Sequence, residues 1–512
     1  MSGRKLRWIG FGLVATAGAG VIGLSAAMNP APAHADDIGL VIGGSADPIP
    51  GPGYVEAADG LYLNNPLTAL YPDLTFYQAT LTNPFGNGLF TPEGAYPLFG
   101  QGVQQLYYNY PLDSDGLPSL STSVGQGASI LQSSILANQA AGDGSTVLGY
   151  SQSSTLSGVT MQLLDPSGTP QTGPLDPQFL LLADPNNPNG GLFERFNGFE
   201  TLSGHSTVDQ LNLASLGIAF SGATPSDDYL TNVYSLEYDG FTDFPRYPIN
   251  LLSDLNAFLG IEDLHGTYLN GGVDGSGPTA EQIANAILLP GSMASGTADS
   301  LTNYYMIDET APLVSLLPKS LQDLLGPDLT YLINLGYGDG SLGYAVTPDS
   351  PADVPTPFGL FPDVSLSTVL STLATDTQQG ITALENDPAA LMASLDPASS
   401  GQGLTDLMSA LEADAADPSA TFTDLVNAIS SAASTAYSLL LPTTDILNSL
   451  VTSLPAWETS IFTDTLSSGD LLDALGLPVA GTAAIGTLAA GFEISIIQDA
   501  ASQIAADFSG LF

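Results

Sequence analysis

Cysteine is absent from this chain of 512 residues, and histidine occurs 3 times. The absence of cysteine excludes disulfide bonds, thiolate nucleophiles and thiolate metal ligands. A metal centre is a poor alternative, because the one acidic loop of interest, Asp113–Gly116, lacks the remaining spacing of a calcium site. We therefore expect no metal and no cofactor, and a fold that depends on the packing of a large core.

Basic residues are also few, since 6 Lys and Arg stand against 52 Asp and Glu, which gives a formal net charge of −46. A chain with this charge repels phosphate groups, so nucleic acids and other polyanions are excluded as partners. The acidity favours solubility but identifies no substrate.

The N-terminal segment has the three parts of a secretion signal. A short basic stretch precedes the apolar run 8–28, and Ala33-His34-Ala35 supplies a cleavage pattern. We predict that residues 1–35 are a signal peptide and that the chain is secreted to the cell envelope. The alternative is an uncleaved membrane anchor, because the apolar run approaches the length of a bilayer span.

Short apolar segments alternate with helical patterns after the signal. The predicted strands are 38–42, 145–149, 179–183 and 233–238, and the predicted helices are 124–141 and 155–164. Buried strands that alternate with helices are typical of a parallel sheet covered on both faces. The sequence therefore predicts an α/β fold.

The composition changes near the Pro-rich stretch 347–358, which is typical of a linker. Beyond it, region 359–512 is rich in Ala, Leu, Ser and Asp, and segments such as 404–415 and 422–441 have apolar residues at helical spacing. We expect an all-α C-terminal extension. The uncharged run 474–492 approaches the length of a membrane span, but its glycines and proline and the lack of basic flanks disfavour one.

The motif Gly149-Tyr150-Ser151-Gln152-Ser153 lies directly between a predicted strand and a predicted helix. A nucleophile elbow needs small residues two positions before and after the serine, because strand and helix approach closely there. Gly149 meets this requirement, and Ser153 meets it less well than the usual glycine. The context therefore predicts that Ser151 is a catalytic nucleophile.

A serine nucleophile needs a general base, and the mature chain offers His205 and His265. In α/β-hydrolases the acid lies between the serine and the histidine along the chain. His265 leaves room for an acid before it, whereas His205 precedes the best acid candidates. We therefore predict His265 as the base.

The acid of a triad lies just past a strand, where it orients the imidazole. We favour Asp243, which lies in the loop after strand 233–238, and Asp239 at the strand end is the alternative. Whichever is not catalytic is expected to hold this loop through an Asx-type turn. Asp184 also follows a strand, but its Asn- and Pro-rich surroundings indicate a turn.

Two groups are candidates for stabilising an oxyanion. The backbone N–H of Gln152 directly follows the nucleophile, which is the usual position of one donor. Ser45 lies in the Gly43-Gly44-Ser45-Ala46 loop after the first strand, where the second donor is expected. An ordinary strand-to-helix turn remains an equal interpretation of this loop.

At these residues the chain resembles the PE-PPE domain family of mycobacteria and their relatives. The resemblance covers roughly residues 38–340 and rests on several motifs in order. They are Ile42-Gly43-Gly44-Ser45, Thr91-Pro92-Glu93, Gly149–Ser153, Pro188–Gly191, Tyr238-Asp239-Gly240, Asp243-Phe244-Pro245, Leu255-Asn256-Ala257 and Leu264–Tyr268.

The resemblance implies a cutinase-like α/β-hydrolase domain over residues 36–346, with a Ser-Asp-His triad and esterase activity on acyl esters. It further implies similarity to secreted acyltransferases that act on trehalose glycolipids, so an acyl ester or acylated glycolipid and the outer envelope lipids are the expected partners. Two features depart from the family. We expect no PE or PPE helical module before the domain, and no counterpart for region 359–512. The alternative function is a catalytically silent envelope scaffold whose acidic tail is the interaction surface.

Overall fold

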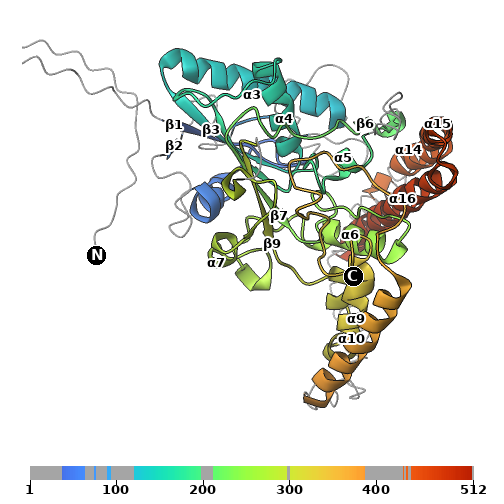
Figure 1. Cartoon of the computed structure of the whole chain (residues 1–512). Coiled ribbons are helices and arrows are strands. Elements are labelled where there is room, and N and C mark those ends of the chain that lie inside the picture. Colours follow the sequence, from blue (N-terminus) through green and yellow to red (C-terminus); the bar gives the residue numbers. More distant parts are fainter. Residues whose placement is uncertain are drawn as a thin grey trace, which may run out of the picture.

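A computed structural model describes residues 37–63, 74–76, 89–93, 120–197, 211–296, 300–386, 430–431, 434–435 and 440–509. The predicted signal peptide, His205 and the predicted helix 404–415 lie outside these residues. The described part is built around one central sheet, with helices on both sides and a helical C-terminal region against one end (Figure 1).

The central sheet has the strand order β2-β1-β3-β4-β7-β9-β8, and every neighbouring pair is parallel except β8 and β9. The strands are β1 (Asp37–Val41), β2 (Leu74–Phe76), β3 (Gly144–Tyr150), β4 (Gln178–Leu182), β7 (Thr231–Leu236), β8 (Ile287–Leu288) and β9 (Thr302–Ile307). The predicted α/β fold with a parallel sheet is confirmed.

Alternate residues of the inner strands face opposite layers of the core. In β4, Phe179 and Leu181 belong to the core under α3 (Leu120–Ala141) and α4 (Gln152–Leu164). Leu180 and Leu182 belong to the opposite core, which includes residues of α1 (Pro52–Ala58) and α7 (Ala280–Ala284). Because both faces are covered, β4 is apolar at successive positions and not only at alternate ones.

The remaining elements connect and flank the sheet. They are the helices α5 (Leu192–Arg195), α6 (Leu251–Asp263), α8 (Pro312–Ser315), α9 (Lys319–Asn334) and α10 (Leu366–Asn386), the short helical turns η1 (Asp59–Leu63), η2 (Ala214–Leu216), η3 (Val273–Gly275) and η4 (Met293–Ser295), and a small antiparallel pair of β5 (Asn212–Leu213) and β6 (Ile218–Ala219).

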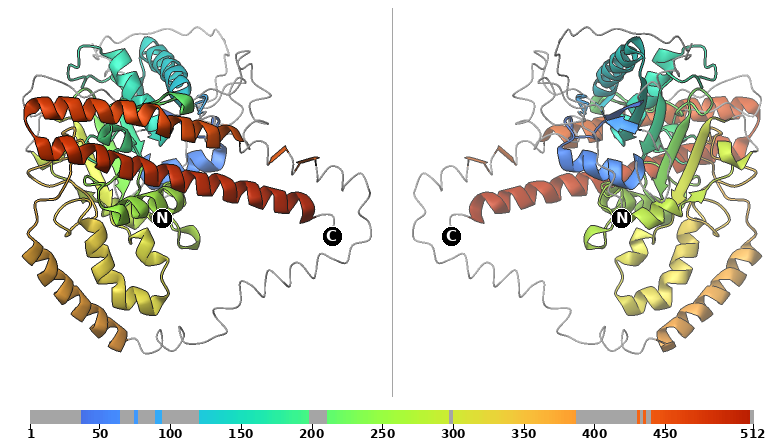
Figure 2. Two further views of the ribbon diagram at one scale, coloured as in Figure 1. Left: turned by 90° about the vertical axis from the view of Figure 1, so that its right-hand side faces the viewer. Right: turned by 90° about the vertical axis from the view of Figure 1, so that its left-hand side faces the viewer.

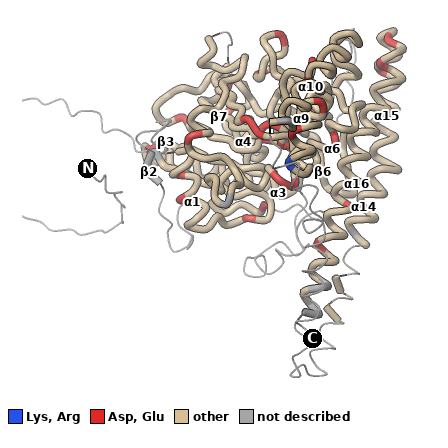
Figure 3. Tube along the Cα trace, turned by 90° about the horizontal axis from the view of Figure 1, so that it is seen from below, with Lys and Arg blue, Asp and Glu red and all other residues tan. Residues whose placement is uncertain are grey.

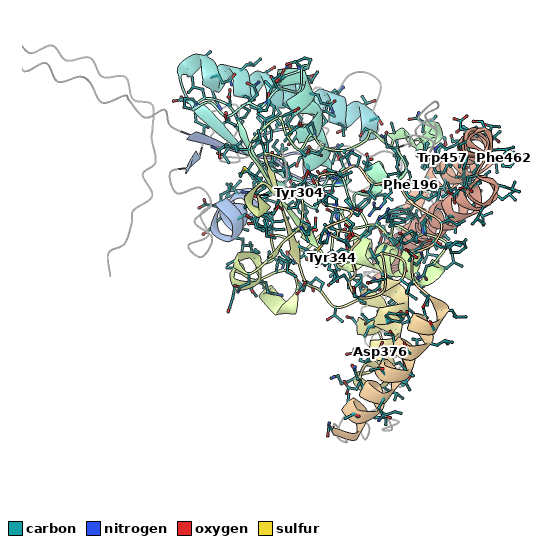
Figure 4. All side chains as sticks on the ribbon, viewed as in Figure 1. Phe196, Tyr304, Tyr344, Asp376, Trp457 and Phe462 are labelled. Atoms are coloured by element: carbon teal, nitrogen blue, oxygen red, sulfur yellow. The ribbon has the colours of Figure 1, made fainter. Side chains whose placement is uncertain are left out.

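The C-terminal region contains α14 (Leu440–Val451), α15 (Ser453–Ser468) and α16 (Leu471–Ser509). Figure 2 shows α15 and α16 as two long helices that lie side by side along one flank. Their buried residues form one continuous core with those of the sheet domain. Phe196 and Trp457, labelled in Figure 4, meet at this junction with ring centroids 5.9 Å apart. The predicted helical extension therefore packs directly on the α/β domain.

The Pro-rich stretch 347–358 is packed against the α/β domain, unlike the free linker that its composition indicated. The Thr356 N–H donates to the Pro188 carbonyl at 2.9 Å, and its own carbonyl accepts from the buried Arg195 guanidinium. Phe358 is buried in the core that the domain shares with the tail. Proline suits this stretch because it lowers the entropy of the unfolded chain without needing a hydrogen-bond donor.

Acidic positions recur along the described trace (Figure 3). The described Lys and Arg residues are Arg195, Arg246 and Lys319, and Arg195 is fully buried. Its Nε donates to the Phe244 carbonyl at 3.2 Å, and one terminal nitrogen donates to Asn189 at 3.1 Å. Burial lowers the Arg195 pKa to about 10. This cation is therefore used to hold loops together and is not available to an anionic partner.

Helix α16 is, among the described residues, long and apolar enough over Leu471–Gln503 to cross a membrane by length and composition. Its glycines allow close packing on α15 and on the α/β domain. A Cβ at Gly481 would lie 2.8 Å from the Trp457 ring, and one at Gly491 would lie 2.5 Å from Phe258 of α6. One face of α16 is therefore packed, while large apolar side chains such as Leu475, Val479 and Ile494 stay exposed.

Candidate active site

Ser151 lies on a sharp turn between β3 and α4. Its backbone has φ 59° and ψ −117°, which is a strained conformation for a residue with a side chain. A Cβ on Gly149 would lie 2.7 Å from the Ser153 carbonyl, so this position tolerates only glycine. This is the geometry of a nucleophile elbow, in which a strained serine lies between a strand and a helix.

Ser153 replaces the glycine that is usual two residues after the nucleophile, and its hydroxyl is used within the elbow. Its Oγ accepts from the Tyr150 N–H at 2.6 Å and lies 3.3 Å from the Ile42 carbonyl at the end of β1. The side chain is fully buried. The departure from glycine is therefore compensated by hydrogen bonds that fasten the elbow to β1.

Ser151, His265 and Asp239 form a continuous hydrogen-bonded chain. The Ser151 Oγ lies 2.7 Å from His265 Nε2, and His265 Nδ1 lies 2.9 Å from one Asp239 oxygen and 3.1 Å from the other. The His265 side chain is 13% exposed, whereas the Asp239 side chain is fully buried. This is the arrangement in which a carboxylate orients an imidazole that takes a proton from serine.

Asp239 is held by a fixed set of donors. The Tyr268 hydroxyl donates to Asp239 Oδ2 at 2.9 Å and accepts from the Leu236 N–H at 2.8 Å, which ties it to the end of β7. The Phe241 N–H donates to Asp239 Oδ1 at 3.1 Å. Tyr238 has φ 68°, and this turn directs the next residue, Asp239, toward His265.

The prediction that Asp243 is the triad acid is wrong on this geometry, and the alternative, Asp239, occupies the position. Asp243 Oδ2 accepts from the Tyr238 N–H at 3.0 Å, and the Asp243 N–H donates to the Asp239 carbonyl at 2.7 Å. Burial raises the Asp243 pKa well above its usual range, which favours a protonated carboxyl. Asp243 thus holds the loop that carries Asp239, but the Asx-type hydrogen bond expected of the non-catalytic aspartate is made by Asp239, which accepts from the N–H two residues on.

Two tyrosines to which the sequence motifs assign no role support the histidine. The Tyr150 hydroxyl donates to the His265 carbonyl, and the Tyr268 hydroxyl orients Asp239. On the other side, the Phe241 ring lies 4.6 Å from the imidazole, measured between ring centroids. Tyr268 lies three residues after His265, and this short distance along the chain is a signal that it is near the site. The sequence does not indicate where its hydroxyl points.

The two predicted oxyanion groups lie beside Ser151. Gln152 is the first residue of α4, where backbone N–H groups point out of the helix toward an anion. The Ser45 hydroxyl donates to the Gln152 side-chain oxygen at 2.8 Å, and Gln152 Nε2 donates to the Ser123 hydroxyl at 2.7 Å. A Cβ on Gly44 would lie 3.3 Å from the Tyr150 carbonyl, so this loop lies directly against the elbow.

Glu93 is a buried carboxyl beside the Ser45 loop. The Ala46 N–H donates to the Glu93 carbonyl at 2.9 Å, and the Thr91 hydroxyl donates to the Glu93 carboxyl. Burial raises the Glu93 pKa from 4.5 to about 8, and the nearby Asp47 acts in the same direction against the Thr91 hydrogen bond. The folded protein therefore keeps this proton at neutral pH, whereas the unfolded chain releases it.

Glu93→Gln is expected to raise the unfolding temperature at alkaline pH. Because the Glu93 pKa is higher in the folded state, the contribution of Glu93 to the free energy of unfolding falls as the pH rises from about 4.5 to about 8. Above that pH the contribution stays constant. Glutamine cannot ionise, so the variant is not destabilised in this way as the pH rises. Thermal unfolding across that pH range is the measurement, and Glu56→Gln on the exposed face of α1 is the control. A variant-minus-wild-type difference that does not change with pH would contradict the assignment.

A cavity of about 460 Å³ opens on Ser151 and His265. Near the triad it is lined by Ser45, Asp47 and Gln152, and elsewhere mainly by aliphatic and aromatic side chains. Some of these come from α6, and others come from α14 and α16 of the C-terminal region. Within the described ranges no group of three or more His, Asp or Glu residues is placed to hold a metal ion.

Comparison with known proteins agrees with this geometry. The profile of the PE-PPE domain matches residues 86–338. The PPE family protein PPE28 of Mycobacterium tuberculosis is 36% identical over 499 residues, which cover 94% of this chain and 68% of that protein. Since so much of the chain is covered, the similarity extends into the C-terminal helices, and the expectation that they have no counterpart is wrong.

Two PE proteins of Mycobacterium tuberculosis match over shorter regions. Esterase PE16 is 41% identical over 256 residues, which are 48% of this chain and 42% of that protein. The PE family protein PE3 is 37% identical over 273 residues, which are 51% of each chain. The matches thus span about half or less of these two relatives. From the matched domain and the long alignment with PPE28, the chain belongs to the PE-PPE domain family, whose domain is a cutinase-like α/β-hydrolase.

Proposed function

We propose that this chain is an exported serine esterase that forms an acyl-enzyme on Ser151. The observation that carries the proposal is the unbroken chain of hydrogen bonds from Ser151 Oγ through His265 to Asp239. A protein relative named as an esterase, PE16, supports the same reaction class. The silent-scaffold alternative has less support, because an unused serine would have no reason to occupy a strained elbow in contact with an oriented imidazole.

In the proposed reaction, His265 Nε2 takes the proton of the Ser151 hydroxyl as the oxygen attacks the ester carbonyl carbon. The carbonyl oxygen becomes an oxyanion, which the Gln152 N–H and a donor of the Ser45 loop stabilise. The C–O bond to the leaving alcohol then breaks, and His265 gives its proton to that alcohol. Asp239 stays ionised and stabilises the imidazolium during both steps.

The acyl-enzyme is resolved by an acceptor hydroxyl, which His265 deprotonates as it deprotonated Ser151. Water as the acceptor gives a free acid, and a sugar hydroxyl gives an acylated sugar. We place the substrate among the acyl esters or acylated glycolipids of the cell envelope, in line with the signal-like segment 1–35 and with the mainly apolar cavity at Ser151.

The proposal is tested by incubating purified mature chain with an aliphatic ester, with and without trehalose, and identifying products by mass spectrometry. Release of free acid at the same rate in both mixtures identifies a hydrolase. Formation of acylated trehalose at the expense of free acid identifies an acyltransferase. If neither product exceeds the amount formed by Ser151→Ala, the proposed function is refuted and the scaffold alternative gains support.

A further inference from the structure

The cavity at Ser151 is built from two parts of the chain that are far apart in sequence. One wall belongs to the α/β domain and includes Phe193, Phe220 and Ile261. The facing wall comes from the C-terminal helices and includes Ile446 and Leu450 of α14 and Ile485, Leu488, Ala489 and Phe492 of α16. The cavity is therefore incomplete without the C-terminal helices.

The two ends of the cavity differ in chemistry. Next to Ser151 are the hydroxyl, amide and carboxyl groups of Ser45, Gln152 and Asp47. The C-terminal wall presents hydrocarbon except for Ser449, whose hydroxyl lies 2.6 Å from the Ser215 hydroxyl. A reactive polar end that continues into hydrocarbon matches an ester whose carbonyl reaches Ser151 and whose acyl chain extends along α14 and α16.

The C-terminal wall is firmly attached. Leu488 of the wall lies in the same buried core as Phe258 and Ile261 of α6, and the Phe492 ring meets Phe258 edge to face at 5.6 Å. The Thr443 hydroxyl at the start of α14 donates to Glu493 of α16 at 2.6 Å. Such packing resists deformation, so the wall sets a definite limit on the size of the chain it receives.

The wall also connects to the triad. The Phe492 ring lies 6.4 Å from the Phe241 ring, and Phe241 lies 4.6 Å from the His265 ring, between centroids. A chain that enters the cavity thus contacts residues of α16 within two side chains of the catalytic histidine. The hydrolase domain and the C-terminal helices therefore line one continuous cavity.

We infer that α14 and α16 form the acyl-chain wall of the active site and determine which acyl lengths the enzyme accepts. The inference rests on the proposed esterase function, which it extends by naming a long acyl chain as the bound group and the C-terminal helices as the residues that select it. Ala489 is the critical position, because its small side chain faces the cavity and leaves space there.

Ala489→Trp fills this space, and Ala490→Trp is the matched control because Ala490 is the next residue and is exposed. We expect Ala489→Trp to lower kcat/KM for p-nitrophenyl decanoate by tenfold or more relative to p-nitrophenyl acetate, since losing room for a few methylenes is worth about that much. The control should keep the wild-type ratio. Ala489→Leu, which disturbs packing less, should shift the ratio in the same direction by a smaller factor.

A binding measurement tests the acyl-chain wall independently of ester hydrolysis. In a Ser151→Ala background, cis-parinaric acid should bind and fluoresce, and adding Ala489→Trp should weaken its binding by a similar factor. If wild type hydrolyses no ester but parinaric acid still binds and responds to Ala489→Trp, the esterase proposal fails and the wall stands. An equal loss on both esters, the same shift from Ala490→Trp, or no parinaric binding in the parent would overturn the inference.

Discussion

Ser151→Ala is expected to lower kcat for ester hydrolysis by about 10⁶-fold. Alanine has no oxygen to attack the carbonyl carbon, and His265 then has no serine proton to accept. The oxyanion donors remain, but without a covalent intermediate they retain only a small part of the acceleration. Steady-state hydrolysis of p-nitrophenyl esters measures the loss.

Ser154→Ala is the matched control for this substitution. Ser154 is buried in the first turn of α4 and donates its hydroxyl to the Leu182 carbonyl at 2.9 Å, but it does not contact His265 in the described structure. Its loss should cost about 1 kcal/mol of stability and leave kcat within a few-fold of wild type. Activity that survives in Ser151→Ala at a tenth of wild type or more would show that another residue is the nucleophile.

Asp239→Asn is expected to lower kcat by about 10⁴-fold without unfolding the protein. An asparagine can donate to Nδ1, so it stabilises the wrong imidazole tautomer and places a proton on the nitrogen that must accept one from Ser151. It also removes the negative charge that stabilises the imidazolium. The asparagine oxygen can still accept from the Phe241 N–H, and the Tyr268 hydroxyl can turn to accept from the amide NH2, so the loop should stay in place.

Asp243→Asn distinguishes the roles of the two aspartates, which the sequence alone could not distinguish. Burial favours the neutral form of Asp243, so a neutral amide resembles the native side chain, and its oxygen can still accept from the Tyr238 N–H. We expect kcat within about tenfold of wild type, with the main effect on the unfolding temperature. Measured kcat and unfolding temperature for both variants test this, and a larger kcat loss in Asp243→Asn than in Asp239→Asn would contradict the triad.

The elbow could be predicted because its requirements are local. A buried strand, a small residue, a serine and a helix occur within one stretch of chain, and β3, Gly149 and α4 appear where they were expected. The identity of the triad acid does not depend on one short stretch of chain in this way. Asp239 and Asp243 both follow β7, and the positive φ of Tyr238 decides which carboxyl faces His265. Neither composition nor residue spacing predicts the φ angle of Tyr238.

The role of the C-terminal helices was hidden for a related reason. Gly481 and Gly491 weaken an isolated helix, and from sequence they argued only against a membrane span. In the structure they are the points at which α16 approaches Trp457 and Phe258. A glycine in a helix looks the same in sequence whether it breaks the helix or admits a neighbouring ring, so the wall of the cavity could not be predicted.

The most direct test of the central claim is to map the residue that reacts with a fluorophosphonate probe. We expect a single phosphonylated peptide that contains Ser151, no label in Ser151→Ala, and slower labelling in Asp239→Asn because the serine is less activated. Labelling of another serine, or labelling of native protein no greater than that of heat-denatured protein, would contradict the assignment of Ser151 as the nucleophile.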